Sequence, residues 1–322
     1  MAIKEEILRY SRQEKMLPLT NWFDATLDNL ISADIYTDIN GLEDTGQKIV
    51  SGLKDYSSLY DIKTAVIGMS GGVDSALTAA LFKAAGWHVI GVTMPIHQRK
   101  EETERGIETC QALKLDHMHI DLTDQYEDLL SRVRDYDLKI DEPNNSIRRG
   151  NLRVRSRMIT LYNIASMARG LVASTDNFSE LAAGFWTLHG DVGDVAPIQS
   201  LIKSWEVPKL AEIYQVPQST VFATPTDGLG ISTGDEDQFG FSYLEFDIVV
   251  MKLCLAYRAF TNRQEMLSYL QVPDSELTTV NKILDRIRTS SFKRSNPYNL
   301  SHPSQPNRYP GLTSIDSALW AK

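Results

Sequence analysis

A glycine-rich stretch near residue 70 has the residue types and spacing that could hold phosphate. Ser70-Gly71-Gly72-Val73-Asp74-Ser75 lies between an apolar run, Thr64 to Met69, and a helix-prone run, Ala76 to Ala85. Adjacent glycines allow a tight turn that brings several backbone N–H groups to one anion, and a following helix adds its positive dipole end. No lysine follows the glycines as in a Walker loop, and Asp74 could hold a cation beside the phosphates. The stretch therefore predicts a phosphate site whose cleavage chemistry differs from that of proteins with a Walker loop.

Alternating strands and helices are expected to position this loop. From residue 60 onward, apolar runs alternate with helix-prone runs. We expect strands at residues 64–69, 88–94, 117–122 and 170–174, with helices beginning at residue 75 and spanning 100–113 and 151–169. This order predicts an α/β fold with a doubly wound, mostly parallel, Rossmann-like sheet whose ligands bind at the carboxyl ends of the strands.

The chain divides into three predicted regions. Residues 1–57 show helical spacing of apolar residues and form a helical N-terminal extension, residues 58–295 form the catalytic domain, and residues 296–322 form a polar, partly disordered tail. Further helices are expected at 242–259 and 263–289. Residues 224–240 are rich in Gly, Asp and Thr, and their composition predicts a mobile lid.

The composition of the chain disfavours nucleic-acid binding, thiolate metal sites and membrane spanning. The chain has 322 residues, 42% of them hydrophobic, and a formal net charge of -9, which disfavours contact with a nucleic-acid backbone. Its two cysteines, Cys110 and Cys254, form no paired motif, so we expect neither disulfides nor a thiolate metal site, and a cytoplasmic location. No run of 18 apolar residues occurs, and membrane spanning is not expected.

Two further segments contain residues that could act at the same site. Residues 150–158 space Arg153, Arg155 and Arg157 two apart, so a helix would turn one or two of them toward a cleft and leave the rest solvated. Residues 174–181 follow a predicted strand, and Thr175 or Asp176 could simply cap a helix there. Taken alone, each segment could have a purely structural role, as a solvated basic helix or as a helix cap.

Taken together and in their order along the chain, the glycine-rich stretch and the two further segments resemble motifs of the NH3-dependent NAD synthetases, a family of N-type ATP pyrophosphatases. The resemblance runs from about residue 64 to residue 294. It implies that ATP, deamido-NAD and ammonia are converted to NAD, AMP and pyrophosphate through an adenylate of the nicotinate carboxylate. It also implies a homodimer and Mg²⁺ as cofactor.

The resemblance assigns roles residue by residue. Asp74 and Glu180 would bind Mg²⁺, and Asp74, Lys203 and Asp191 would act in catalysis. Asp191 and Asp194 are both candidates for orienting deamido-NAD and receiving ammonium. The ATP contacts that it implies are Gly68, Met69, Ser70, Gly71, Gly72, Val73, Asp74, Ser75, Thr175, Lys203 and Thr226. The implied deamido-NAD contacts are Arg155, Asp194 and Lys293.

The chain departs from the family pattern at several positions. Leu188 stands where many members have a lysine that contacts substrate, His189 replaces an aromatic residue, and Phe292 replaces a histidine. One residue is also missing before Pro197. These departures imply that some contact to the dinucleotide is lost or supplied by other residues.

Other interpretations remain open at this point. Another N-type ATP pyrophosphatase could amidate or thiolate a different substrate, although the absence of paired cysteines disfavours tRNA thiolation. Gly68-Met69-Ser70-Gly71-Gly72 also matches the nucleophile elbow of α/β-hydrolases, with Ser70 as nucleophile. A protein that binds nucleotide without turnover is the third possibility. His117 and His119 could lie on one strand face as metal ligands, but packing against a neighbouring strand explains them as well.

Overall fold

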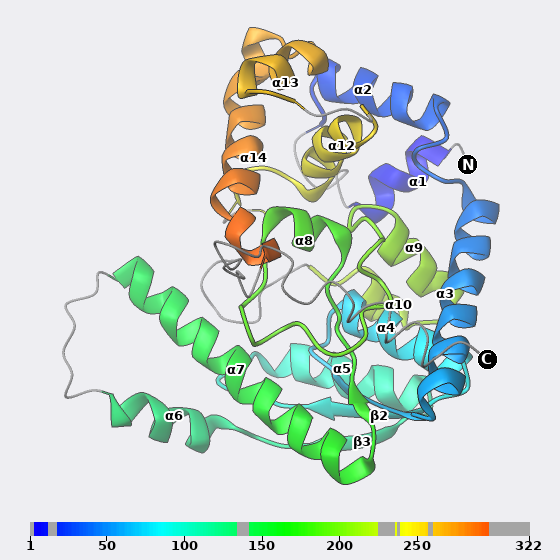
Figure 1. Cartoon of the computed structure of the whole chain (residues 1–322), viewed down its shortest axis with the longest axis vertical. Helices are drawn as coiled ribbons and strands as arrows, with labels where there is room; N and C mark the ends of the chain where they lie inside the picture. Colours follow the sequence, from blue (N-terminus) through cyan, green and yellow to red (C-terminus); the bar gives the residue numbers. More distant parts are fainter. Residues whose placement is uncertain are drawn as a thin grey trace, which may run out of the picture.

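The computed structural model describes residues 3–11, 18–133, 142–224, 236, 239–256 and 260–295. Its centre is a parallel sheet of four strands in the order β3-β2-β1-β4 (Figure 1). The strands are β1 (Thr64–Gly68), β2 (His88–Thr93), β3 (Asp116–His119) and β4 (Leu171–Val172). The expected α/β fold with a parallel sheet is confirmed.

Alternating residues of the strands bury the two faces of the sheet in two separate hydrophobic clusters. Ala65 and Ile67 of β1 belong to the larger cluster, with helices α3 (Ile39–Tyr60), α4 (Val73–Ala84) and α9 (Glu206–Ile213). Val66 belongs to the smaller cluster, beneath α6 (Thr123–Arg132) and the long helix α7 (Glu142–Ala168). Helices therefore cover both faces, as in a doubly wound sheet.

Helices from both ends of the chain also pack on the side of the larger cluster. The N-terminal helices are α1 (Ile3–Tyr10) and α2 (Asn21–Ser32), and α2 contacts α12 (Tyr243–Cys254) (Figure 1). Trp205 is fully buried, and its indole N–H donates to the carbonyl of Thr37 at 2.9 Å. This hydrogen bond thus connects the N-terminal extension to the segment that carries Lys203.

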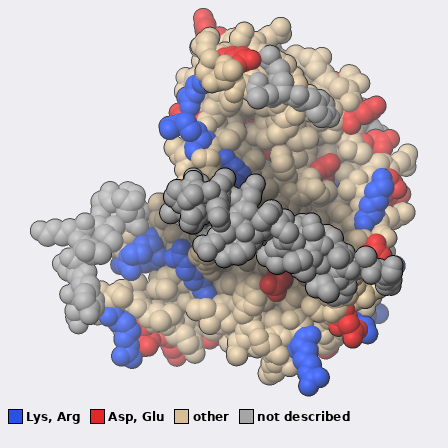
Figure 2. Space-filling view, viewed as in Figure 1, with Lys and Arg blue, Asp and Glu red and all other residues tan. Residues whose placement is uncertain are grey.

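Short helices and the C-terminal helices complete the described chain. They are α5 (Lys100–Ala112), α8 (Phe178–Ala183), α10 (Gln218–Val221), α13 (Arg263–Leu270), η2 (Asp274–Glu276), α14 (Leu277–Thr289) and η3 (Ser291–Ser295). Within the described ranges, no helix combines the length and the apolar character that crossing a membrane requires. Acidic and basic side chains are interspersed over the face drawn in Figure 2, so the net negative charge is not gathered there.

Several predicted boundaries were wrong. The expected helix at 263–289 is two helices, because Gln271 ends α13 in a left-handed conformation with φ 55° and Pro273 cannot continue the helix. The strand expected at 117–122 ends at His119, and the helix expected at 151–169 begins at residue 142. Helix α3 continues past residue 57, where the sequence places the boundary between the N-terminal extension and the next domain. This domain boundary stays a prediction. The expected lid and tail fall largely outside the described residues.

Candidate active site

The glycine-rich stretch forms a tight loop between β1 and α4. Gly71 has φ +87°, and a Cβ there would lie 2.0 Å from the backbone oxygen of Glu102 on α5. Ser75 Oγ donates to the carbonyl of Gly72 at 3.0 Å, and the Gly72 N–H donates to Ser70 Oγ at 3.2 Å. Glycine at position 71 is therefore required both by the backbone conformation and by the approach of α5.

A cavity of about 560 Å³ opens beside this loop, within the range typical of ligand sites. It brings together predicted residues that are far apart in the sequence. The predicted site residues that line it are Gly68, Met69, Ser70, Gly71, Gly72, Val73, Asp74, Ser75, Thr175, Glu180, Asp191, Lys203 and Lys293. The loop thus lies at the carboxyl end of β1, where a parallel sheet binds its ligands.

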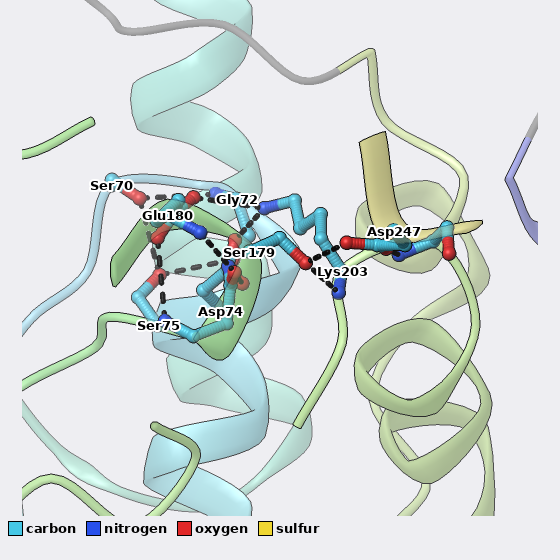
Figure 3. Close-up of polar contacts among 10 residues, drawn as sticks. Ser70, Gly72, Asp74, Ser75, Ser179, Glu180, Lys203 and Asp247 are labelled. Carbon is cyan, nitrogen blue, oxygen red and sulfur yellow. Dashed lines mark hydrogen bonds and ion pairs between the residues drawn. The ribbon is translucent and has the colours of Figure 1, made fainter. Parts of the chain in front are cut away.

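Two carboxylates converge on one cation in this cavity. Asp74 is in the first turn of α4, and Glu180 is in the first turn of α8. The Lys203 ammonium contacts Asp74 and lies 3.5 Å from Glu180 Oε1 (Figure 3). Because both carboxylates present oxygen atoms to one positive centre, they fit the all-oxygen coordination that Mg²⁺ prefers, with phosphate and water as further ligands.

Asn177 fixes the geometry of this acidic pair. Its amide Nδ2 donates to Asp74 Oδ1 at 2.9 Å. Its Oδ1 accepts from the backbone N–H of Glu180 at 3.0 Å, and the Glu180 side chain accepts from the Asn177 N–H, which closes a capping box. The helix cap is therefore Asn177, not Thr175 or Asp176 as the structural interpretation of this segment had it. Glu180 has both the capping contact and the contact to Lys203.

Charged side chains gather on the wall of the cavity around Asp191. Arg157 donates from Nε to the carbonyl of Met94 at 3.0 Å and from Nη2 to Gln98 Oε1 at 3.2 Å. Lys293 Nζ donates to the carbonyl of Gly184 at 2.8 Å. These cations lie among carboxylates of the same wall, so an anionic substrate group and a cationic one could both be bound there.

Burial shifts the pKa of several groups in this wall. The pKa of Asp191 is raised, chiefly by burial and against the hydrogen bond from the Thr187 N–H. The pKa of Asp176 is raised to about 7 by burial and by the nearby charge of Asp191. Burial lowers the pKa of Lys293 and lowers the pKa of Arg157 to about 10. Because this value is still well above 7, the Arg157 guanidinium stays charged at neutral pH. Buried acids beside bound cations are typical of functional sites.

Two of the predicted contacts that the structure describes, Arg155 and Asp194, do not line this cavity. Arg155 is exposed, and its Nε donates to the carbonyl of Leu188 at 3.1 Å. Asp194 is exposed too, and it accepts from the Tyr162 hydroxyl at 2.8 Å and from the Val172 N–H at 2.9 Å. Thr226 lies outside the described residues. The roles implied for these three residues stay predictions.

The hydrolase and histidine-metal interpretations receive no support from the described residues. No histidine is among the described residues that line the cavity, and Ser70 Oγ instead lies 3.2 Å from Ser75 Oγ, so the described residues form no hydrolase triad at Ser70. His117 and His119 both hydrogen-bond Thr93 Oγ1 of the neighbouring strand, at 3.0 and 2.9 Å. Within the described ranges, no cluster of three His, Cys, Asp or Glu side chains could hold a metal ion.

Comparisons with known proteins show the family of this chain. The family model described as NAD synthase matches residues 45–297 of this chain. The chain belongs to the NAD synthase family. An NH3-dependent NAD⁺ synthetase of Mycoplasmopsis pulmonis is 36% identical over 224 residues, which are 69% of this chain and 84% of that protein.

Solved structures give the same fold for this NAD synthase family member. An NMN synthetase from Francisella tularensis has a TM-score of 0.66 and 25% identity, and the match covers 81% of this chain and 98% of that one. An NH3-dependent NAD synthetase from Campylobacter jejuni has a TM-score of 0.62 and 24% identity, and covers 81% and 99% of the two chains.

The resemblance chose Arg155 among the three alternating arginines, and neither Asn177 nor Gln98 was singled out from the sequence. Arg157 lines the cavity where Arg155 does not, because the phase of α7 about its axis decides which of the alternating arginines faces inward. Asn177 could have been found, since Asn followed three residues later by Glu resembles a capping box. Gln98, which donates to the carbonyl of Ser70 at 3.1 Å, carried no such signal.

Proposed function

We propose that this protein amidates deamido-NAD to NAD with ammonia and ATP, releasing AMP and pyrophosphate. The nicotinate carboxylate attacks the α-phosphate of ATP and forms an acyl-adenylate, and ammonia then attacks the activated carbonyl and displaces AMP. The observation that carries the proposal is that the phosphate loop, the acidic pair Asp74 and Glu180, and Lys203 all face one cavity in a member of the NAD synthase family.

The residues of the loop would hold the departing pyrophosphate. Backbone N–H groups from Ser70 to Ser75 and the start of α4 stabilise negative charge, and Lys203 neutralises the phosphates as charge moves onto the leaving group. Thr175 is proposed to contact ATP. Because a carboxylate is already ionised near pH 7, the first step needs no strong base, and positioning supplies much of the acceleration.

The wall of the cavity around Asp191 would bind the acceptor and the ammonia. Asp191 is proposed to receive ammonium and take a proton, since its raised pKa brings the carboxyl closer to neutral pH. Lys293 and Arg157 supply positive charge beside it. We also propose Mg²⁺ at Asp74 and Glu180, where the bound ion would offset phosphate charge. The matching oxygen donors of the two side chains support this assignment.

We further propose a homodimer formed through the outer face of α7. Ile159 and Met167 on this helix are 70% and 69% exposed, which is unusual for large apolar side chains of one helix. Arg155 and the Asp194 partner Tyr162 belong to the same helix, so a second protomer would cover the predicted dinucleotide contacts. A cytoplasmic location is proposed from the free state of Cys110 and Cys254.

The decisive experiment is mass detection of the products. Purified protein is mixed with ATP, Mg²⁺, deamido-NAD and ammonium, and AMP, pyrophosphate and NAD are quantified against a mixture without deamido-NAD. We expect equal amounts of AMP and NAD. Release of ADP and inorganic phosphate, which marks cleavage of the β,γ bond, would refute the proposal. ATP binding without AMP formation would instead favour a nucleotide-binding protein without turnover.

A second candidate is the amidation of nicotinate mononucleotide to NMN by the same chemistry. It is favoured by the resemblance to the Francisella tularensis NMN synthetase and by the replacement of a substrate-contacting lysine with Leu188. Both reactions activate the same nicotinate carboxylate. Comparing kcat/KM for the dinucleotide and the mononucleotide in one preparation distinguishes them.

A further inference from the structure

Three successive backbone N–H groups around Lys203 each have a side-chain acceptor. The Ile202 N–H donates to Glu206 Oε2 at 2.8 Å, the Lys203 N–H donates to Ser179 Oγ at 2.9 Å, and the Ser204 N–H donates to Asp247 Oδ2 at 3.0 Å. This segment belongs to no helix or strand, so its conformation depends on these contacts.

Asp247 is the residue that joins these contacts to the rest of the site. It lies on α12, is 1% exposed, and its Oδ1 accepts from Ser179 Oγ at 2.5 Å (Figure 3). Ser179 precedes Glu180 in the chain, and Ser204 follows Lys203. The buried carboxylate of Asp247 thus links the segment that carries Glu180 to the segment that carries Lys203.

Helix α12 makes a second contact with Lys203. The Lys203 ammonium lies 5.8 Å from the ring centroid of Tyr243, which is one helical turn before Asp247. Residues four apart lie on the same helix face, so this face of α12 flanks both the backbone and the ammonium of Lys203. The direction of the Lys203 side chain is therefore set from both of its ends.

We propose that Asp247 is a positioning residue of the reaction, which acts through Ser179 and the Ser204 N–H to hold Lys203 against the triphosphate. The inference rests on the proposed role of Lys203 in binding ATP phosphates. A carboxylate accepts both hydrogen bonds with charge assistance, which makes them stronger than bonds to a neutral acceptor. Asparagine at this position has one acceptor oxygen for the two donors, so one of them faces an NH2 group.

Binding of the non-cleavable analogue α,β-methylene-ATP with Mg²⁺, measured by calorimetry, tests the proposal. We expect Asp247→Asn to raise the Kd about tenfold, since one hydrogen bond to a charged group is lost. Because Asp247 acts through Lys203, the double variant Lys203→Ala with Asp247→Asn should bind no more weakly than Lys203→Ala alone. A residue with a merely structural role would weaken binding in both backgrounds, and that result would overturn the proposal.

A matched control separates positioning from loss of stability. Thr109→Val breaks another hydrogen bond between buried side chains, 3.1 Å from Thr109 Oγ1 to Thr220 Oγ1, and neither residue lines the cavity. It should lower Tm and leave the Kd unchanged. If Asp247→Asn does not fold, Ser179→Ala removes the acceptor of the Lys203 N–H and is expected to raise the Kd in the same way.

Amide hydrogen exchange tests the contacts without reference to catalysis. Exchange at residues 202–204 should be faster in Asp247→Asn than in the wild-type protein, and unchanged in Thr109→Val. Equal exchange in all three proteins would overturn the proposal, as would a Lys203→Ala variant that binds the analogue like the wild type. Failure of the proposed function would be seen separately, as a wild-type protein that forms no AMP.

Discussion

The ammonium of Lys203 contacts the carboxylate of Asp74, 129 positions away in the sequence, and lies 3.5 Å from Glu180 Oε1. This lysine therefore lies between the two carboxylates to which Mg²⁺ binding is proposed. Each carboxylate is largely buried, so removing either one leaves a buried ammonium with fewer partners.

Asp74→Asn and Glu180→Gln should each abolish Mg²⁺-dependent adenylation while the fold is kept. The expected loss of AMP formation is roughly 100-fold or more, because a charged ligand that offsets phosphate charge is removed. Initial rates at saturating ATP and increasing Mg²⁺ measure the effect, and Tm reports the fold. Asp285→Asn, a carboxylate outside the cavity that pairs with Arg263, serves as control. Near-normal turnover in either site variant would refute the metal assignment.

Gly71→Ala should prevent the loop from forming its phosphate site. The new Cβ would meet the Glu102 carbonyl at 2.0 Å, and the φ of +87° is unfavourable for alanine. Gly86→Ala is a matched control, because its φ is +82° and no atom lies within 4 Å of the new Cβ. We expect the control to lose about 1 kcal/mol of stability and to keep ATP affinity. Equal ATP affinity in both variants would contradict the requirement for glycine at position 71.

Local patterns predicted the parts of the site that one segment forms by itself. The two glycines and the flanking apolar run indicated both β1 and the phosphate loop, because turn conformation and strand burial depend on neighbouring residues. The hydrogen bond from Asn177 to Asp74 joins residues 103 positions apart, and the hydrogen bond from Ser179 to Asp247 joins residues 68 positions apart. Such pairs depend on the packing of α8 and α12, which no local spacing specifies.

Restoring lysine at Leu188 should not weaken binding of deamido-NAD. The Leu188 side chain is half-buried, and its contact with Arg155 is made through the backbone carbonyl, so the substitution leaves that contact in place. A lysine could add an attraction for a phosphate of the dinucleotide and lower the KM. The measurement is KM for deamido-NAD in Leu188→Lys, with Leu188→Met as the neutral control. A large rise in KM for the lysine variant alone would show that the family alignment is wrong here.

Glu206→Gln should make stability less dependent on pH. Burial raises the pKa of Glu206 from 4.5 to about 7, against the hydrogen bond from the Ile202 N–H. Between these values the native state keeps a proton that the unfolded chain has released, so wild-type stability falls as pH rises from 4.5 through 7. The loss is on the order of 1 to 3 kcal/mol and is complete above the native pKa.

Thermal unfolding at pH 5 and pH 8.5 measures this effect. The Tm of Glu206→Gln relative to the wild type should be higher at pH 8.5 than at pH 5, because glutamine has no charge to bury. The pKa of Asp247 is also raised, to about 6, chiefly by burial, and the Asp247 charge is one of the causes of the raised pKa of Glu206. The same difference in Tm at both pH values would show that Glu206 titrates alike in the folded and unfolded chain.

Ile159→Glu should convert the proposed homodimer to a monomer. Ile159 is 70% exposed on α7, and a carboxylate buried in an interface without a partner costs several kcal/mol of association. Light scattering after size exclusion should give twice the 36.2 kDa chain mass for the wild type and the single chain mass for the variant. Ile39→Glu, at a 39% exposed isoleucine on α3, is the control and should stay dimeric. A wild type that is already monomeric, or an Ile159→Glu dimer, would exclude this face of α7 as the interface.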